Sequence, residues 1–261
     1  MMSEELFYKL ALSCVEGIGP VKYRKILEHV GSAKEIFTSS TKRLKSIQGI
    51  SDANARAIVH FKHHDRIEKE IRFTEKNNIQ VVEESEENFP QRLKQCVDAP
   101  PFLFYKGNAD LNAMRIVSII GTRLFTDYGR AACEELIETL KQYSVTVVSG
   151  LAFGIDAIAH KNCVKQQLPT IGVVAHGLHT IYPTAHQALA AEMMENGGIL
   201  TEYFSGTKPD KGNFPMRNRI VAGLSNATII IKKKKKGGSM ITADLAHSYN
   251  RELFCLPGRT T

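Results

Sequence analysis

The chain has 261 residues, of which 43% are hydrophobic, and its formal net charge at pH 7 is +7. No apolar run approaches the roughly 18 residues of a membrane helix, and the first residues lack a basic signal-peptide head, so we expect a cytoplasmic protein with no membrane partner. Five of the seven net charges belong to one lysine run, so the total charge does not by itself indicate a nucleic-acid ligand.

The first 78 residues are predicted to be helical, because apolar positions recur at steps of three and four in FYKLALSCV, VKYRKILEHV and ANARAIVHF. Two glycine-bearing turns, at 15–27 and 47–58, separate helices and resemble helix-hairpin-helix elements. Glycines let a backbone approach a phosphate at the start of a helix. DNA contact, protein contact and a purely structural role all remain open for this helical domain.

Residues 79–261 are predicted to form an α/β domain. Within it, 79–114 is a connecting module with an acidic loop, a short helix and a Pro-Pro break before an apolar strand. From 115 on, short apolar runs alternate with helical stretches, which predicts a Rossmann-like, doubly wound parallel sheet. The expected strands are RIVSII, VTVVS, TIGVVA, GILTE, ATIII and ELFCL; the expected helices lie around 127–142, 155–167, 184–196, 215–224 and 240–250.

The loop after the first strand of this sheet is a glycine turn, Gly121-Thr122-Arg123. Ligands of such sheets bind beyond the carboxyl ends of the strands, so the loops that follow strands are the candidate sites. The turn matches neither a dinucleotide nor a triphosphate fingerprint, and we expect no cofactor. Arg123 could bind a phosphate with its guanidinium fork, or it could hold its own loop in place.

The next loop contains Ser149 and Gly150, and the helix that follows carries Asp156 and His160. These two side chains, four residues apart on one helical face, could form an acid–base pair. An aspartate that stabilises the helix start and bonds to the histidine explains them equally well. No serine or cysteine nucleophile stands beside them, and the five cysteines lack the spacing of a metal site.

A polar loop at 202–212 runs into a helix expected to begin near Phe214. Phe214 could stack on an unpaired base or pack in the core. Arg217 and Arg219 are two residues apart on that helix, so they point in different directions, and one can face the ligand while the other braces the fold.

The last loop combines the lysine run with a Gly-Gly-Ser turn, in which Ser239 is a suitable N-cap for the following helix. The predicted ligand-facing residues of this loop are Lys232, Lys233, Lys234, Lys235, Lys236, Gly237, Gly238 and Ser239.

Five segments resemble the DNA-processing protein A (DprA, or Smf) family in their order and spacing. They are SGLAFGIDAIAH, YPTAHQALA, TEYFSGTKPDKGNFPMRNRIVAGLS, KGGSMITADLA and FCLPGR. The resemblance is strong over 80–259. It implies a homodimeric accessory protein without catalytic activity that binds single-stranded DNA and loads the recombinase RecA during natural transformation. Because members continue beyond the equivalent of the last strand, it also implies a truncated C-terminal end.

Carried over by position, the resemblance places Gly121, Thr122 and Arg123 in a positively charged DNA pocket, with Phe214, Arg217 and Arg219 around it. Ser149 and Gly150, like Gly237, Gly238 and Ser239, become its backbone walls. The lysine run departs from the family, which has an acid where Lys232 stands.

Two other functions are compatible with the fold. A phosphoribohydrolase-like enzyme could hold a nucleotide at the same rim, but the Pro-Gly-Gly-x-Gly-Thr loop and catalytic glutamate of such enzymes are missing here, where GGSMITAD offers only Asp244. A protein-interaction adaptor, with the helical domain as its main surface, is the third interpretation.

Overall fold

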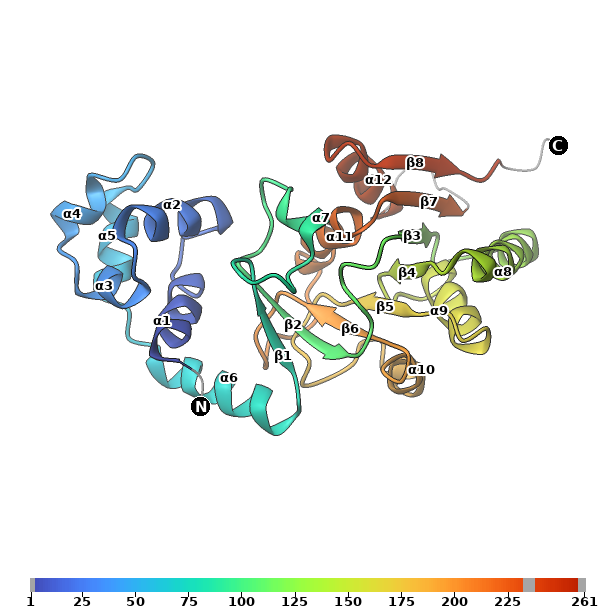
Figure 1. The fold of residues 1–261 in the computed structure, drawn as a ribbon, viewed down its shortest axis with the longest axis horizontal. Coiled ribbons are helices and arrows are strands. Elements are labelled where there is room, and N and C mark those ends of the chain that lie inside the picture. Colours follow the sequence, from blue (N-terminus) through green and yellow to red (C-terminus); the bar gives the residue numbers. More distant parts are fainter. Residues whose placement is uncertain (1–2, 232–237, 258–261) are drawn as a thin grey trace. The chain divides into compact units, whose positions relative to one another are not determined.

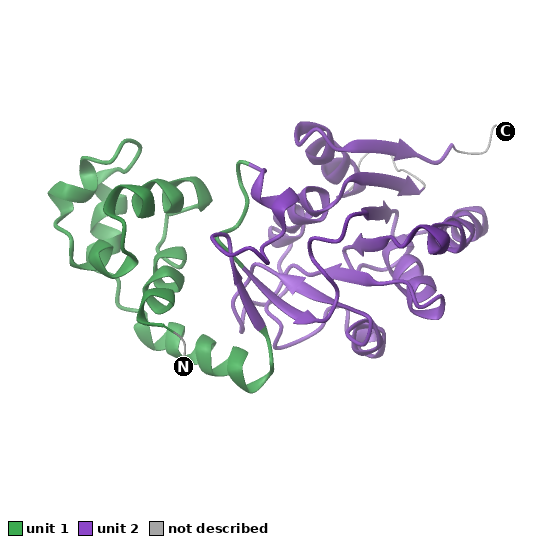
Figure 2. Ribbon diagram, in the orientation of Figure 1, with its two compact units in different colours: residues 1–79, 97–102 green, residues 80–96, 103–261 purple. Residues whose placement is uncertain are grey.

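The computed structural model describes residues 3–231 and 238–257, and the chain divides into two compact units (Figure 2). The first unit comprises residues 1–79 and 97–102, and the second comprises residues 80–96 and 103–261. None of the helices described is both long enough and apolar enough to cross a bilayer.

The first unit is entirely helical, as its apolar periodicity predicts. Serine side chains accept the first free backbone N–H groups at the starts of four of its helices, which fixes where each begins. Leu10, Ile26, Ile36 and Ile58 are fully buried and form part of its core. The helices are α1 (Glu4–Ser13), α2 (Pro20–Val30), α3 (Ala33–Thr38), α4 (Thr41–Lys45), α5 (Asp52–Val59) and α6 (His64–Lys76).

The two glycine turns of this unit precede α2 and α5 and are tied together by side chains. The Asn54 amide donates to the Gly17 carbonyl oxygen at 3.2 Å, and the Lys22 ammonium donates to the same oxygen at 3.1 Å and to Asn54 Oδ1 at 2.8 Å. Gly17 has φ +76°, a conformation that favours glycine. The turns therefore form one interlocked pair of hairpins.

The second unit is built on one eight-stranded sheet of order β1-β2-β6-β5-β4-β3-β7-β8 (Figure 1). Neighbouring strands from β6 to β8 are parallel, which confirms the doubly wound parallel fold. The strands are β1 (Gln80–Glu83), β2 (Phe102–Gly107), β3 (Ile116–Gly121), β4 (Thr146–Ser149), β5 (Thr170–Val173), β6 (Gly197–Thr201), β7 (Ala227–Ile231) and β8 (Glu252–Cys255).

Helices cover both faces of this sheet. α8 and α10 pack beside α9 on one face, and α11 packs against α12 on the other (Figure 1). Both α9 and α11 contact β3, β4 and β5, so these strands are buried on both sides, which explains their unbroken apolar runs. The helices are α7 (Gln91–Lys94), α8 (Asp127–Leu140), η1 (Lys141–Tyr143), α9 (Ile155–Lys165), η2 (Thr184–His186), α10 (Gln187–Met193), α11 (Asn213–Leu224) and α12 (Gly238–Ser248).

Four details differ from the sequence prediction. β1 was not predicted, and β2 runs antiparallel to β6, with Phe104 opposite Thr201. The helix expected at 184–196 is a 3₁₀ turn, η2, followed by the shorter α10. Ser239 is not an N-cap, because α12 already begins at Gly238.

The strand order creates a crevice beside β3. The chain runs outward from β3 through β4, β5 and β6, then returns to place β7 on the opposite side of β3. The connections that leave β3 and β7 therefore turn toward opposite faces, and a crevice opens between them at the carboxyl ends of the strands. Most of the predicted site residues that the structure describes lie near this point.

Candidate nucleic-acid interface

A pocket of about 850 Å³ lies at this crevice, and strand-end loops and helix starts line it. It brings together eight of the ten predicted residues that the structure describes. Those eight are Gly121, Thr122, Arg123, Gly150, Phe214, Arg217, Gly238 and Ser239.

The outer part of the pocket is a cluster of aromatic rings and cations. The exposed Arg123 guanidinium lies over the half-buried Phe214 ring, 5.8 Å from its centroid. The ring of Tyr182 is 6.0 Å from that of Phe214 at 45°. Lys211, at the end of the polar loop, also lines the pocket. Arg123 is thus available to a ligand, whereas the alternative expectation was that it would hold its own loop.

Tyr182 and Lys211 were not among the predicted site residues. Both stand in segments that carry the family resemblance, YPTAH and TKPDKGNF, but no rule of spacing ranks one lysine or tyrosine in a loop above another. Tyr182 reaches the site through its ring contact with Phe214, and Lys211 through its place in the loop that leads into α11.

Two helix starts also face the pocket. Phe214 and Pro215 belong to the first turn of α11, and Gly238 and Ser239 to the first turn of α12. The free N–H groups of a helix start carry partial positive charge, which attracts phosphate. The first turn of α11 contributes less of this charge, because Pro215 has no N–H and the Asn213 N–H donates to the Asp210 carbonyl oxygen at 3.1 Å. Asn218 ties the two helices together, since its amide donates to the Gly238 carbonyl oxygen at 3.2 Å.

The floor of the pocket is a buried pair of opposite charges, Arg217 and Asp156. The Arg217 guanidinium donates to the carbonyl oxygens of Gly150, at 2.6 Å, and of Val173. Asp156 Oδ2 accepts the backbone N–H groups of Gly150, at 3.1 Å, and Ala152, at 3.4 Å. A Cβ at Gly150 would lie 2.7 Å from both Arg217 Nη2 and Asp156 Oδ2, so a larger residue would have to displace one of these two groups.

The pKa values of this pair reflect burial and mutual attraction. Burial lowers the pKa of Arg217 to about 10, with the charge of Asp156 opposing the shift, so the guanidinium stays protonated at neutral pH. Burial raises the pKa of Asp156, and the charge of Arg217 and the two backbone N–H donors oppose that rise. The pair thus holds the loop after β4 in place beneath the pocket.

The loops after β3 and β4 are held together at Gly154. This residue has φ +84°, and a Cβ there would lie 2.3 Å from the Thr122 carbonyl oxygen. The Ile155 N–H donates to that same oxygen at 3.2 Å. The Gly121-Thr122-Arg123 turn is therefore fixed by the start of α9, which positions Arg123 before any ligand binds.

Two predicted site residues do not reach the pocket. Arg219 is buried and paired with Glu202, because it lies two residues after Arg217 on α11 and points elsewhere. Ser149 is fully buried and donates to the Ile119 carbonyl oxygen at 2.6 Å. Six other predicted site residues lie outside the described part of the chain: Lys232, Lys233, Lys234, Lys235, Lys236 and Gly237.

The Asp156–His160 hydrogen bond considered above is not formed. His160 is fully buried, and its Nδ1 lies 2.7 Å from Thr170 Oγ1. Because that hydroxyl donates to the Val147 carbonyl oxygen at 3.1 Å, it accepts from His160 Nδ1–H. Within the described part of the chain Nε2 has no hydrogen-bond partner, as expected for a neutral ring. The two side chains are thus placed as separate structural groups, not as an acid–base pair.

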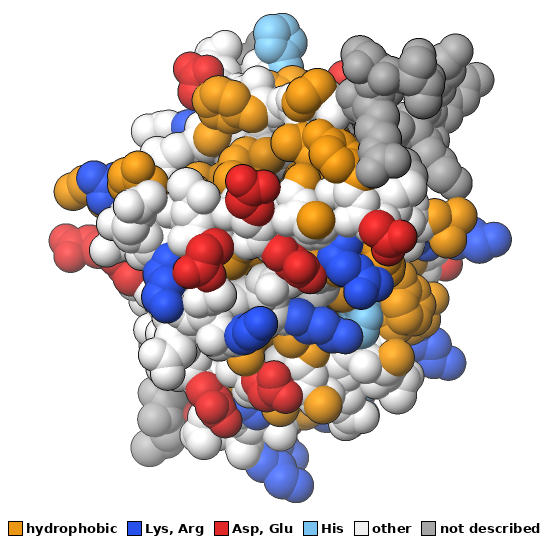
Figure 3. Space-filling model, turned by 90° about the vertical axis from the view of Figure 1, so that its right-hand side faces the viewer, with side chains coloured by type: hydrophobic (Ala, Val, Ile, Leu, Met, Phe, Trp, Pro, Cys, Tyr) orange, Lys and Arg blue, Asp and Glu red, His pale blue; other side chains and the backbone are white. Residues whose placement is uncertain are grey.

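The pocket differs in charge from the face of the molecule that Figure 3 shows. On the face viewed in Figure 3, acidic and basic side chains lie side by side. The charged residues that line the pocket within the described chain are three cations, Arg123, Lys211 and Arg217, and one carboxylate, Asp156. Positive charge is therefore concentrated at the crevice.

Two family models match this chain, one in the helical part and one in the α/β part. The sequence model of the family described as DNA recombination-mediator protein A matches residues 80–261. The chain belongs to this family. A second model, described as a SAM-like helix-hairpin-helix tandem, matches residues 9–61, where the structure has its interlocked pair of hairpins.

Relatives in the DNA recombination-mediator protein A family include Protein Smf of Synechocystis sp., which is 34% identical over 98% of this chain and 66% of its own length. The DNA processing protein DprA of Bacillus subtilis is 40% identical over 69% of this chain and 61% of its own length. The chain therefore spans about 61 to 66% of the length of these two curated relatives.

Two solved structures have the same fold. The crystal structure of DNA processing protein A from Streptococcus pneumoniae superposes with a TM-score of 0.81 and 29% identity, covering 99% of this chain and 88% of that one. A structure described as showing a single-stranded DNA binding mode of DNA processing protein A from Helicobacter pylori has a TM-score of 0.64 and 36% identity, covering 71% of this chain and 84% of that one.

Acidification is expected to destabilise the second unit through His160. Burial lowers the pKa of this histidine from 6.5 to about 3, so between these values only the unfolded chain takes up its proton. The stabilisation is present above pH 6.5 and is lost as pH falls toward 3, with a slope of up to about 1.4 kcal/mol per pH unit. Urea unfolding at several pH values measures this slope, and His160→Gln, which removes the titrating group, should flatten it. An equal slope in both proteins between pH 6.5 and 4 would contradict the assignment.

Proposed function

We propose that the chain binds single-stranded DNA in the crevice beside β3 with little sequence preference. One observation carries the proposal. The half-buried ring of Phe214 lines the same pocket as the cations Arg123 and Lys211, between the starts of two helices. Aromatic rings that stack on bases and cations that follow the phosphates are the two components of non-specific single-strand binding.

The geometry favours an unpaired strand over a duplex. Phe214 is reached through the pocket and not on a flat surface, so a base must leave its stack before it can lie on that ring. Arg123 offers a planar fork for one phosphate, which fixes the strand without reading its bases. The single-strand binding mode named for the Helicobacter pylori relative supports the same ligand class.

For the whole protein we propose that it protects incoming single-stranded DNA and loads RecA on it during natural transformation, as a homodimer in the cytoplasm. The family membership supports this role. We propose binding and handover and not turnover, because Asp156 and His160 at this rim are engaged with backbone N–H groups and with Thr170. The positive lysine run would add to the attraction for phosphates.

The test compares fluorescently labelled oligo-dT with a duplex of equal length, using anisotropy and the full chain at several salt concentrations. We expect the single strand to bind at least about tenfold more tightly than the duplex, with affinity falling steeply as salt rises. Adenosine monophosphate serves as the competitor for the enzyme alternative. Equal affinity for the two DNA forms, or displacement of the oligonucleotide by micromolar adenosine monophosphate, would contradict the proposal.

A further inference from the structure

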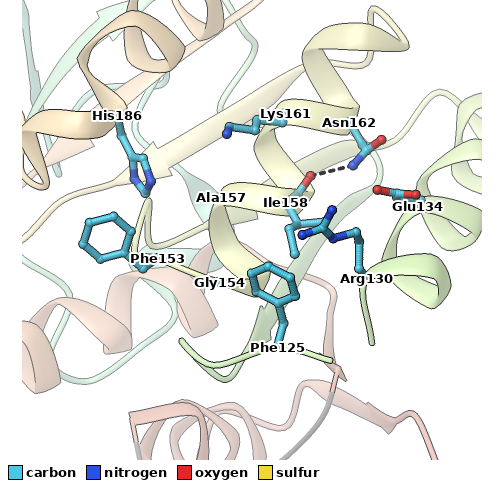
Figure 4. A pocket seen from close by; sticks show the side chains of 10 residues that line it. All are labelled: Phe125, Arg130, Glu134, Phe153, Gly154, Ala157, Ile158, Lys161, Asn162 and His186. Atoms are coloured by element: carbon cyan, nitrogen blue, oxygen red, sulfur yellow. Dashed lines mark hydrogen bonds between the residues drawn. The ribbon is translucent and has the colours of Figure 1, made fainter. Parts of the chain in front are cut away.

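A second pocket, of about 350 Å³, lies between α8 and α9 on the other side of the loop that follows β3 (Figure 4). Its residues come from four places: Phe125 and Arg130 from the loop before α8 and its first turn, Lys161 from α9, Phe153 from the loop before α9, and His186 from η2. The volume is at the small end of the range for ligand sites, roughly 300 to 1,000 Å³.

The two phenylalanine rings of this pocket are exposed but held in place. Phe153 is 49% exposed and Phe125 is 36% exposed. The Arg130 guanidinium lies over the Phe125 ring at 4.7 Å, and the Phe153 ring packs at 65° against His186, with centroids 5.0 Å apart. His186 is itself buried, with Nδ1 2.9 Å from the Leu151 carbonyl oxygen. Ring positions fixed before binding lower the entropy cost of stacking a ligand on them.

The second pocket shares a wall with the first. Leu124 lines the first pocket, and its neighbour Phe125 lines the second; likewise Ala152 lines the first and Phe153 the second. Consecutive Cα atoms are about 3.8 Å apart, so the two pockets are separated only by the thickness of these two loops. A chain-like ligand that leaves one pocket can therefore enter the other by crossing this wall.

We propose that the pocket between α8 and α9 is a second subsite for single-stranded DNA, which takes an unpaired base of the same strand that occupies the first pocket. This inference rests on the proposed function. The base would stack on Phe153 or Phe125, and Arg130 and Lys161 would neutralise the flanking phosphates.

The charge of the pocket favours DNA over a protein partner. Lysine is depleted in the centres of protein–protein interfaces, whereas cations beside aromatic rings are what a single strand needs. Arg130 and Lys161 provide two positive charges here against the single carboxylate of Glu134. That carboxylate can accept a hydrogen bond from a base amino group.

The experiment uses the full chain and an oligo-dT series from about 4 to about 12 nucleotides, read by anisotropy. A short oligonucleotide fills only the first pocket, so Phe153→Ala should leave its affinity unchanged and weaken the longer ones roughly tenfold. Phe153→Tyr, which keeps a stacking ring, should restore the affinity. Tyr143→Ala is the matched control, since Tyr143 is an exposed aromatic residue of η1, 52% exposed, that lines neither pocket.

A second substitution, Lys161→Gln, keeps the rings and should reduce the salt slope by about one for the longer oligonucleotides only. The inference is wrong if neither substitution affects any length, or if Phe153→Ala weakens all lengths equally, which would place its effect in the first pocket. If the parent protein binds no oligonucleotide at all, the proposed function fails and the second subsite with it. If the parent protein binds every length with the same affinity and Arg123 is still needed for that binding, the second subsite is wrong while the proposed function stands.

Discussion

Replacing Arg217 with methionine is expected to destabilise the second unit by about 3 to 5 kcal/mol, which is a large share of the stability of a typical domain. The substitution removes the donor to the carbonyl oxygens of Gly150 and Val173 and leaves the buried Asp156 without its positive neighbour. Breaking a buried charge pair from one side costs more than the pair contributes, because the remaining charge cannot reach water.

Hydrogen exchange of the β4 and β5 amides measures this effect for the second unit alone, since those strands open only when that unit unfolds. The double variant Arg217→Met, Asp156→Asn should recover part of the loss, because it removes the stranded carboxylate as well. A loss below about 1 kcal/mol for Arg217→Met, or no recovery in the double variant, would show that the two groups are not coupled.

Replacing Arg123 with alanine is expected to lower the affinity for oligo-dT about 10- to 100-fold at low salt and to reduce the salt slope by about one. In the proposed complex the guanidinium supplies one phosphate contact, and in the structure it lies over the Phe214 ring, 5.8 Å from its centroid. Arg123→Lys should keep the slope but not the full affinity, because an ammonium is a point charge without the planar fork.

The matched control is Lys165→Ala, which removes an exposed cation of the last turn of α9 that lines neither pocket. We expect the slope and affinity of this variant to equal those of the parent. If Arg123→Ala and Lys165→Ala behave alike, the crevice beside β3 is not where phosphates bind.

The centre of the sheet in the second unit could be predicted because β3, β4 and β5 are buried on both faces and therefore read as unbroken apolar runs. β1 escaped prediction for the opposite reason: QVVE is a four-residue edge strand followed directly by an acidic loop. The antiparallel direction of β2 depends on its pairing with β6, some 90 residues away, and no local pattern contains that information.

The site residues that directly follow the end of a strand could be predicted from the sequence. Arg123 and Gly238 follow the ends of β3 and β7, so the strand order alone brings them to one crevice. The sequence does not show which of Arg217 and Arg219 lies at the pocket. Helix periodicity shows that residues two apart point in different directions, but not which one points to the ligand. Carbonyl oxygens of the β4 loop and of β5 hold Arg217, and these contacts are known only from the folded chain.

The central claim is that a base stacks on the ring at position 214, and a tryptophan placed there tests it most directly. The chain has no tryptophan, so Phe214→Trp gives a single indole signal from the pocket. We predict that oligo-dT quenches this emission and that the change saturates at the same concentration as the anisotropy of labelled DNA. Unchanged emission while the anisotropy reports full binding would place the DNA elsewhere on the molecule.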